Sequence, residues 1–277
     1  MPEQPAYIEL ANGVAIPPIG FGTWPIPDRK VEPMVAAAID AGYRLIDTAE
    51  LYENEGGVGR GIRAAPVDRS EVFVTTKLSQ RSHGREEAKR AFAASASRLG
   101  LDYLDLFLIH WPNPDLDRYV DAWRGMIDLL EQDKVRAIGV SNFKPAHLSR
   151  LIDETGVAPH VNQIQLNPWI PRIAEREYHA AHDIVTESWA PIGKGGGLLD
   201  DRVITGLAEK LDRTPAQVVI SWHLQLGLIP IPKTAHPDRL VENLDVFGFS
   251  LTDDEIEQLT GLDRGGEGVV DSDHTGL

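Results

Sequence analysis

Gly42-Tyr-Arg-Leu-Ile-Asp-Thr-Ala-Glu-Leu-Tyr52 contains a short apolar strand that ends on an acid and is followed by a phenol. The predicted strand is Arg44–Thr48, in which Leu45 and Ile46 precede Asp47. A protein core has little use for a carboxylate at this position. An enzyme can use both groups, because a phenol placed at a strand end can give or take a proton. The stretch therefore predicts a catalytic site, provided that other strands supply partners.

The same pattern, an apolar strand with a polar residue at its end, is repeated along the chain and alternates with helical segments. Apolar residues in those segments recur at helical spacing, as in Val31, Val35 and Ala38. The strands are predicted at Ile19–Gly22, Arg44–Thr48, Val72–Thr76, Leu104–Ile109, Val135–Val140, His160–Ile164, Ile184–Ser188 and Leu228–Ile231. Eight strands that alternate with eight helices predict an α/β fold, the (β/α)8 TIM barrel. A doubly wound parallel sheet is the alternative, but a barrel brings all the polar strand ends to one face.

Three further features accompany the predicted barrel. Asn12-Gly13 lies between apolar residues of segment 7–16 and predicts an N-terminal β-hairpin with a two-residue turn. Extra helices are predicted near residues 200–211 and 253–262, the second after a capping box that begins at Thr252. No linker-like stretch divides the chain, so we expect residues 1–277 to form a single domain.

Composition excludes several classes of function. The 27 basic and 42 acidic residues give a net charge of −15, which argues against nucleic acid or an anionic membrane as a partner. No cysteine is present, so disulfides, thiolate metal sites and cysteine nucleophiles are excluded. The first residues, Met1-Pro-Glu-Gln-Pro, lack the basic and apolar regions of a signal peptide, and no apolar run reaches about 18 residues. We expect a cytoplasmic protein.

Four polar side chains follow successive strands, and we call them the tetrad: Asp47, Tyr52, Lys77 and His110. Neighbouring barrel strands place such side chains within reach of one another. The ammonium of Lys77 is expected to lower the pKa of the Tyr52 phenol, and Asp47 to hold that ammonium in place. His110 could orient a carbonyl substrate or relay a proton. A phenol tuned in this way can protonate an oxygen while hydride reaches the adjacent carbon.

Hydride must come from a nicotinamide cofactor, because protein side chains cannot supply it. The usual phosphate-binding fingerprints are absent: Gly57–Gly61 has the wrong glycine spacing, and Gly193–Gly197 lacks the end of a P-loop. The first of these is expected to serve helix packing and the second to form a flexible loop.

Other residues offer cofactor contacts. Trp189 ends the seventh strand, where its ring can stack on a nicotinamide, and Ser141, Asn142 and Gln163 can hydrogen-bond a carboxamide. Phosphate binding is expected at the eighth strand and the helix after it, where basic and hydroxyl side chains gather: Lys233, Thr234 and Arg239.

From about Ile8 to the tail, the chain resembles the aldo-keto reductases. The motifs that carry the resemblance are Gly42-Tyr-Arg-Leu-Ile-Asp-Thr-Ala with Tyr52, Asn54 and Glu55; Thr76-Lys77-Leu; Leu108-Ile-His110-Trp-Pro; Ile138-Gly-Val-Ser-Asn-Phe143; Asn162-Gln163-Ile-Gln-Leu-Asn-Pro168; and Ile231-Pro-Lys-Thr234 with Arg239, Glu242 and Asn243. Glu187-Ser-Trp189 and Leu244-Asp-Val-Phe are similar to the bacterial branch that includes 2,5-diketo-D-gluconate reductases.

The resemblance implies NADPH-dependent reduction of an aldehyde, α-dicarbonyl or keto-sugar acid, with Tyr52 as general acid and the tetrad as catalytic set. It implies no metal and a monomer. The cofactor contacts that it implies are Gly22, Thr23, Ser141, Asn142, Gln163, Trp189, Lys233, Thr234, Arg239, Glu242 and Asn243. Trp24 and Trp111, with His110, are candidates for the substrate pocket, although plain packing explains either tryptophan equally well.

Some residues depart from the family pattern. His236 replaces an arginine that relatives often carry near the adenosine phosphate, and Asn167 replaces a frequent histidine. Glu50 and Glu53 add charge beside Tyr52 and would disfavour anionic substrates if they faced the pocket. Two other functions remain as alternatives: a cofactor-binding regulatory barrel with little turnover, and a hydrolase that uses Asp47 and His110 without a cofactor.

Overall fold

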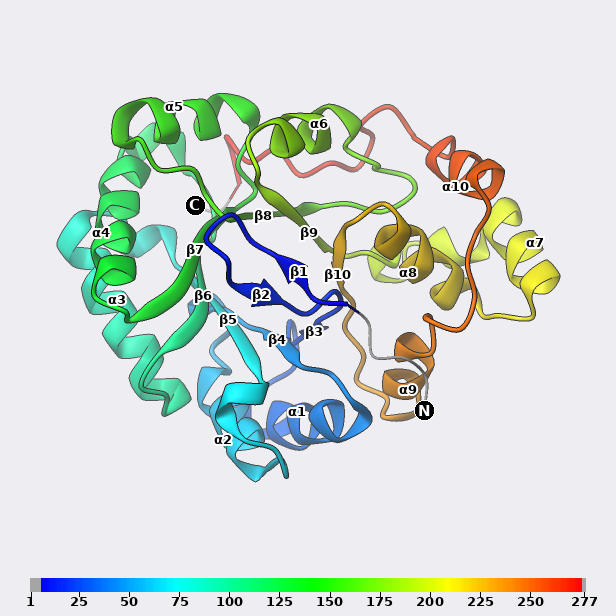
Figure 1. Ribbon diagram of the computed structural model, residues 1–277, viewed down its shortest axis with the longest axis horizontal. Coiled ribbons are helices and arrows are strands. Elements are labelled where there is room, and N and C mark those ends of the chain that lie inside the picture. The colour runs from blue at the N-terminus through cyan, green and yellow to red at the C-terminus, as the bar shows by residue number, and fades with distance from the viewer. Residues whose placement is uncertain (1–5, 276–277) are drawn as a thin grey trace.

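The computed structural model of the protein describes residues 6–275, so both ends of the predicted 1–277 domain, including Met1–Pro5, lie outside the described residues. Eight parallel strands form one sheet in the sequential order β3 to β10, ringed by helices (Figure 1). The strands are β3 Phe21–Gly22, β4 Leu45–Asp47, β5 Phe73–Leu78, β6 Leu104–Ile109, β7 Val135–Ser141, β8 Val161–Gln165, β9 Val185–Trp189 and β10 Ile229–Ile231. A doubly wound sheet would reverse its strand order, so the prediction of a (β/α)8 barrel is confirmed.

Within residues 6–275, eight helices cover the barrel and two are additional. The covering helices are α1 Asp28–Ala41, α2 Glu55–Ala64, α3 Arg85–Leu99, α4 Tyr119–Glu131, α5 Pro145–Thr155, α6 Ile173–Ala181, α8 Pro215–Gln225 and α9 Asp238–Leu244. The additional helices are α7 Arg202–Leu211 and α10 Asp253–Thr260, close to the predicted segments. Thr252 caps α10 by accepting the Glu255 N–H, as the capping box predicts. No helix in residues 6–275 is long and apolar enough to cross a membrane.

The barrel closes through backbone hydrogen bonds between its first and last strands. The N–H of Gly20 donates to Pro230 O and that of Gly22 to Pro232 O, both at 3.0 Å. The bond that would lie between these two requires an N–H from residue 232, which proline lacks. The seam between β3 and β10 is therefore held by every second bond of a parallel ladder.

The N-terminal hairpin closes the end of the barrel opposite the tetrad. β1 Ile8–Glu9 pairs with β2 Ala15–Ile16, and the Leu10 N–H donates to Val14 O. The loop thus spans residues 11–13, one residue longer than predicted, with Gly13 at φ +80°. This is the three-residue hairpin loop that ends in a left-handed glycine. Figure 1 shows the hairpin across the centre of the ring, where Leu10 and Ile16 join the apolar barrel interior.

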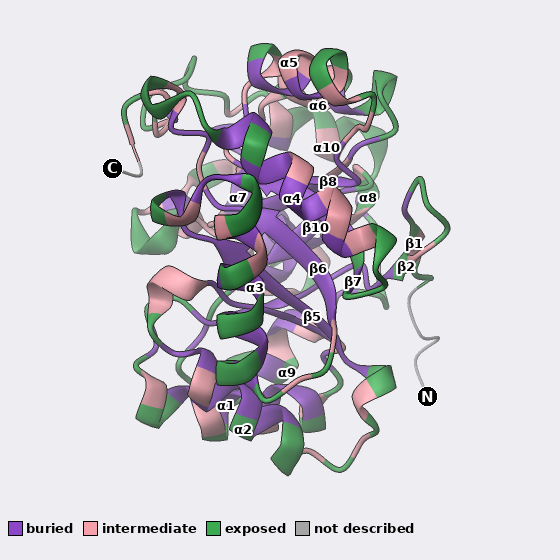
Figure 2. Cartoon of the chain, turned by 90° about the vertical axis from the view of Figure 1, so that its left-hand side faces the viewer, coloured by how far each residue is buried: buried purple, intermediate pink, exposed green. Residues whose placement is uncertain are grey.

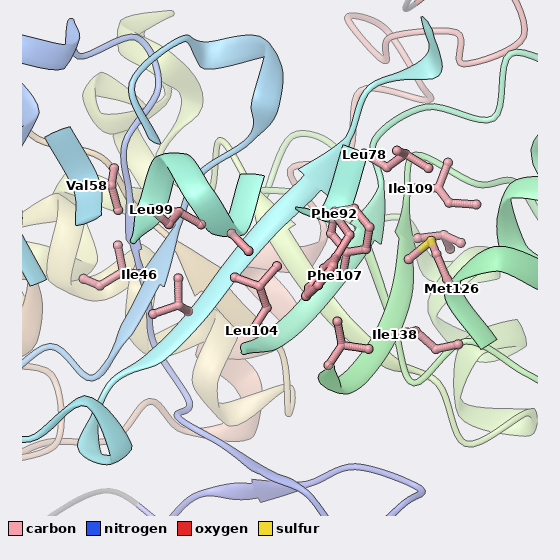
Figure 3. Close-up of a cluster of buried hydrophobic side chains, with 14 of the residues drawn as sticks. Ile46, Val58, Leu78, Phe92, Leu99, Leu104, Phe107, Ile109, Met126 and Ile138 are labelled. Carbon is pink, nitrogen blue, oxygen red and sulfur yellow. The ribbon is translucent and has the colours of Figure 1, made fainter. Parts of the chain in front are cut away.

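Alternation along the strands separates an outer from an inner side-chain layer. Outward residues such as Ile46, Phe107 and Ile138 pack against helix residues including Phe92 and Met126 (Figure 3). The strands are consequently buried, whereas the helices expose their outer faces (Figure 2). This apolar layer between the strands and the helices holds the strands in place, and so it fixes the positions from which the inner side chains project.

The inner layer changes character along the barrel axis. Near the hairpin it is apolar, formed by residues such as Leu45, Phe73 and Val161. Two residues further along β4, and correspondingly along β8, the same face carries Asp47 and Gln163. The carboxyl-terminal half of the barrel interior is therefore polar, and it is the half that the predicted site occupies.

The tail after α10 contains turns but no helix or strand up to residue 275, as expected for a Gly-rich segment. It lies against the loops that follow β7 and β8. Lys144 pairs with Asp271 and Asp273 at 2.6 Å each. The Gln165 side chain donates to Gly268 O and accepts the Val270 N–H, so the tail is held beside the carboxyl-terminal face.

Candidate active site

The structure brings the tetrad together at the carboxyl-terminal end of the barrel. Lys77, fully buried on β5, donates to the Asp47 carboxylate on β4 at 2.6 and 2.7 Å and to Thr48 O at 3.0 Å. Its Nζ atom lies 5.2 Å from the centre of the Tyr52 ring. The rings of Tyr52 and His110 meet edge to face, with centroids 5.6 Å apart. One ammonium is thus in contact with the acid and close to the phenol, as predicted.

The Lys77 side chain carries its charge in this buried position. Burial disfavours the ammonium, but the acidic groups around it, the Asp47 carboxylate above all, outweigh burial and hold the pKa of Lys77 above its ordinary value. A buried ammonium with two carboxylate contacts is a strong charge-assisted hydrogen-bond donor. Lys77 therefore remains a positive charge beside the phenol at any physiological pH.

The pKa of Tyr52 differs from the expectation. Burial raises it above the ordinary value of 10.0, and Asp47 raises it further, while Lys77 lowers it. The expected effect of Lys77 is present, but burial is the larger effect, so the net shift is upward. The phenol consequently keeps its proton at neutral pH, which is the form needed to protonate a carbonyl oxygen.

The surroundings of His110 favour its neutral imidazole form. Burial and the nearby Lys77 charge lower the pKa of His110 well below 6.5. Its ring stacks on Trp111, with centroids 6.2 Å apart, and its Nδ1 has no hydrogen-bond partner among residues 6–275. A neutral imidazole can still donate one hydrogen bond, so the geometry suits orientation of an oxygen better than supply of a proton.

The short 3-10 turn Glu50–Tyr52 presents the phenol and is anchored on both sides. The Glu50 carboxylate accepts the Ser79 N–H at 3.0 Å, which ties the turn to the loop after β5. Asn54 is buried and accepts the Thr48 hydroxyl at 2.8 Å. Glu53 ends the turn in the left-handed region, at φ 54°, and is exposed. Glu50 therefore has a structural contact, which weakens the idea that it repels anionic substrates.

The four predicted nicotinamide contacts join one hydrogen-bonded group, Gln163 through its backbone carbonyl. Asn142 donates to His110 O and to the Ser141 hydroxyl, and accepts the Trp189 indole N–H at 2.7 Å. The Ser141 hydroxyl in turn donates to Gln163 O at 2.8 Å. Every donor in the Ser141 and Asn142 side chains is thus used internally, and only acceptor capacity remains. These residues fit a nicotinamide cofactor, because the carboxamide of that group presents N–H donors.

Glu187 is a site residue that the sequence reasoning missed. It lies on β9 in register with Gln163 on β8, fully buried, and its Oε2 accepts the Gln163 Nε2–H at 2.9 Å. The same Nε2 donates to Asp47 Oδ2 at 2.8 Å, so a polar chain crosses the barrel from Glu187 to Lys77. The available signal was an acid inside a strand, two residues before Trp189 and hence on the same face.

Glu187 is protonated at neutral pH. Burial, with a further contribution from Asp47, raises its pKa from 4.5 to about 8. Between those values the unfolded chain releases the proton and the folded protein keeps it, so stability falls as the pH rises. Glutamine has no such proton to lose. We expect Glu187→Gln to increase the free energy of unfolding by about 3 kcal/mol more at pH 7.5 than at pH 5.

Urea unfolding of both proteins at the two pH values measures this difference. Glu55 offers a matched control, because it is equally buried but bonded to Arg98 and Thr76 away from the site. Because Glu55 is ion-paired with Arg98, Glu55→Gln should lower the free energy of unfolding rather than raise it. A Glu187→Gln effect that is the same at both pH values would mean that the folded protein holds Glu187 ionised.

The predicted phosphate patch contains two exposed basic side chains. Lys233 and Arg239 are exposed after β10 and form no ion pair within residues 6–275. The Thr234 hydroxyl, in contrast, is engaged with the backbone of His236. Two neighbouring basic side chains, exposed and without acidic partners within residues 6–275, fit an anionic group.

The two predicted adenine contacts are less available. The Glu242 carboxylate accepts the Thr214 hydroxyl at 2.8 Å, and Asn243 is buried in α9. The two predicted cofactor contacts at the end of β3, Gly22 and Thr23, are likewise engaged within the protein. Gly22 is buried in the barrel seam, and the Thr23 hydroxyl donates to Asp47 O at 3.0 Å. These four residues therefore have structural contacts beside any that a cofactor would make.

The candidate substrate residues Trp24 and Trp111 are both accessible, Trp24 being 49% exposed. Lys194, a second residue that sequence reasoning missed, places its Nζ atom 5.0 Å from the Trp24 ring and 4.4 Å from the Trp189 ring. The loop expected at Gly193–Gly197 forms a tight turn, and it holds this ammonium between the two tryptophans. Within residues 6–275, no group of three His, Asp or Glu side chains could hold a metal ion.

Comparison with known proteins agrees with this geometry. Residues 18–264 match the model of the Aldo/keto reductase family. The 2,5-diketo-D-gluconic acid reductase B of Corynebacterium sp. is 51% identical over 265 residues, which cover 96% of this chain and 95% of the relative. The methylglyoxal reductase DkgA of Escherichia coli is 45% identical over 274 residues, 99% of each chain.

Solved structures give the same result. A mutant of Gox0644 in complex with NADPH matches with a TM-score of 0.93 and 46% identity over 98% of both chains. An aldo/keto reductase from Brucella melitensis matches with a TM-score of 0.92 and 43% identity over 95% of this chain and 99% of that one. The resemblance inferred from the motifs is confirmed: the chain belongs to the aldo/keto reductase family, and it is an NADPH-dependent oxidoreductase that reduces carbonyl groups.

Proposed function

We propose that Tyr52 is the proton donor of this reductase, that Lys77 and Asp47 form its charged support, and that His110 orients the substrate carbonyl. NADPH, when bound, supplies the hydride to the carbonyl carbon. Tyr52 then gives its phenolic proton to the carbonyl oxygen, which yields the alcohol and a phenolate that takes a proton back from solvent. The observation that carries the proposal is the buried Lys77 ammonium, held by Asp47 5.2 Å from the Tyr52 ring centre.

The cofactor contacts in this proposal divide between the two ends of NADPH. Ser141, Asn142 and Gln163 would hold the carboxamide, and Trp189 would stack on the nicotinamide ring. This assignment is supported by the acceptor-only capacity of Ser141 and Asn142. At the adenosine end, Lys233 and Arg239, which form no ion pair within residues 6–275, would hold the 2′-phosphate. The remaining predicted contacts at this end are Thr234, Glu242 and Asn243.

Removing the positive charge at position 233 tests the phosphate assignment. Lys233→Ala is expected to weaken NADPH binding by about ten- to a hundredfold, the value of a charge-assisted hydrogen bond, and to change NADH binding less than about twofold. Fluorescence titration of both cofactors measures the two dissociation constants. Lys134→Ala, an exposed lysine before β7 at the opposite end of the barrel, is the matched control. Equal losses for NADPH and NADH would remove the 2′-phosphate from Lys233.

The substrates that we propose are small α-dicarbonyls and keto-sugar acids. Support comes from the similarity to relatives named for diketogluconate and methylglyoxal. The matched region covers 95% or more of the length of each relative. The partly exposed Trp24 and Trp111 would line the pocket beside the tetrad. An NADPH-oxidation screen over aldehydes, dicarbonyls and keto-sugar acids tests this class, and higher kcat/KM for simple alkyl aldehydes than for both proposed classes would contradict it.

We further propose that the chain acts as a single-domain monomer in the cytoplasm. The sequential eight-stranded sheet, which uses strands from residue 21 to residue 231, supports a single domain. A cysteine-free sequence is compatible with a reducing compartment. Light scattering after gel filtration should give a mass near 30.5 kDa, and a multiple of that mass would replace the monomer.

A further inference from the structure

We propose that Glu187 is a positioning residue for cofactor recognition: its carboxyl group, together with Asp47, fixes the Gln163 amide so that the Gln163 carbonyl oxygen is the atom offered to the nicotinamide carboxamide. The inference rests on the proposed contact between Gln163 and the cofactor. It adds a residue that contacts neither the substrate nor the cofactor and acts through its neighbour.

The hydrogen bonds of Gln163 carry the argument. An amide nitrogen has two N–H donors. In Gln163 one is given to Asp47 Oδ2 at 2.8 Å and the other to Glu187 Oε2 at 2.9 Å. The carbonyl oxygen Oε1 has no hydrogen-bond partner among residues 6–275. Gln163 therefore has no spare donor for a ligand and one free acceptor.

The two carboxyl groups make this orientation selective. They reach Gln163 from two different strands, Asp47 from β4 across the barrel and Glu187 from the neighbouring strand β9. A reversed amide would turn its oxygen toward the Asp47 carboxylate and would lose both hydrogen bonds that Gln163 Nε2 donates in the structure. Without Glu187, only Asp47 would oppose reversal.

Glu187 has no other visible task. Gln163 is the only hydrogen-bond partner of its side chain among the described residues, and its Oε1 is buried without a partner. Burial of an acid costs free energy unless hydrogen bonds compensate for the lost contacts with water. The charged groups that face it are Asp47 from β4 and Lys77 from β5. As a neutral acid, Glu187 provides an acceptor without adding a second negative charge to compete with Asp47 for the Lys77 ammonium.

Two forms of the cofactor test the inference through binding alone. In the 3-acetylpyridine analogue of NADPH a methyl ketone replaces the carboxamide, so the N–H donors that Gln163 Oε1 would accept are absent. The dissociation constants of NADPH and of the analogue can be measured by quenching of tryptophan fluorescence. We expect the wild-type protein to bind NADPH at least about five- to tenfold more tightly than the analogue, since one hydrogen bond is worth that much and the Ser141 and Asn142 acceptors can add to it.

Variants at position 187 should change that ratio. Glu187→Leu and Glu187→Ala remove the acceptor, and we expect the ratio of the two dissociation constants to fall by about five- to tenfold in both, the value of the Gln163 hydrogen bond. Glu187→Gln restores an uncharged acceptor and should keep the wild-type ratio. Ser188→Ala, on the same strand but facing away from the interior, is the control and should also keep it.

Three results would overturn the inference. The first is an unchanged ratio in Glu187→Leu and Glu187→Ala, even if both cofactors bind more weakly, because that is a general structural effect. The second is a ratio lost in Glu187→Gln as in Glu187→Leu. The third is a wild-type protein that binds both cofactors equally, which would remove the Gln163 contact as well and is thereby distinguishable from failure of Glu187 alone.

Discussion

Replacement of Tyr52 by phenylalanine is expected to lower kcat for NADPH-dependent carbonyl reduction by about 10²–10⁴-fold, the range for loss of a general acid. The substitution removes one oxygen atom and leaves the ring against His110. Lys77 and Asp47 retain their ion pair, so the charge distribution is kept. We therefore expect the dissociation constant of NADPH to change less than about twofold, since the phenol acts on the substrate oxygen. Steady-state kinetics and cofactor titration measure the two effects separately.

Tyr103→Phe is the matched control for this experiment. It makes the same chemical change at the opposite end of the barrel, where the Tyr103 ring packs under Arg69. Its kcat should equal that of the wild-type protein. A Tyr52→Phe protein that retained more than about a tenth of wild-type kcat would show that the proton comes from another group.

Replacement of Lys77 by methionine should damage both stability and catalysis. The variant leaves the buried Asp47 carboxylate without its cation, and removal of one partner of a buried pair costs about 3–5 kcal/mol. Catalysis should fall because no ammonium remains to stabilise the Tyr52 phenolate formed when the proton leaves. Urea unfolding gives the first quantity and kcat gives the second.

A double variant separates the two consequences of losing Lys77. Asp47→Asn with Lys77→Met removes both charges, so most of the lost stability should return because no unpaired carboxylate remains. Activity should stay low, since the ammonium is still missing. If the double variant were no more stable than Lys77→Met alone, the buried pair would not be the source of the destabilisation.

The sequence was sufficient to predict the barrel and the gathering of the tetrad. Buried parallel strands such as Leu104–Ile109 are nearly continuous apolar runs, interrupted here only by Asp105, and this pattern marks them clearly. Because all strand ends of a barrel converge on one face, residues 47, 77 and 110 could be brought together by counting strands. Helix ends were equally visible, since Gly42 adopts the left-handed conformation at the end of α1.

Contacts across the barrel could not be predicted in the same way. The bond between Gln163 and Asp47 joins residues 116 positions apart on strands that are not neighbours, and no local pattern encodes it. The tight turn that holds Lys194 between two tryptophans likewise depends on where the loop after β9 folds. Glu187 was overlooked because its importance depends on its contact with Gln163 in the folded barrel, and no sequence motif marks that contact.

The direction of the Tyr52 pKa shift shows a second kind of limit. A nearby lysine is visible in the sequence order of the strands and favours the phenolate. The opposing effect of burial depends on how completely the turn Glu50–Tyr52 and its neighbours enclose the phenol, which only the folded structure gives. The sequence indicates that Lys77 lowers the pKa of Tyr52 and that burial would raise it, but it does not show which of the two effects is larger.

Turnover is the most direct test of the claim that the polar half of this barrel reduces carbonyl groups with NADPH. Purified protein is mixed with NADPH and methylglyoxal, the absorbance of NADPH is followed, and the alcohol formed is quantified. The structure predicts many turnovers per chain, with one NADPH consumed for each carbonyl reduced. Binding of NADPH with less than one turnover per chain for aldehydes, dicarbonyls and keto-sugar acids alike would contradict the claim and leave a cofactor-binding barrel without catalysis.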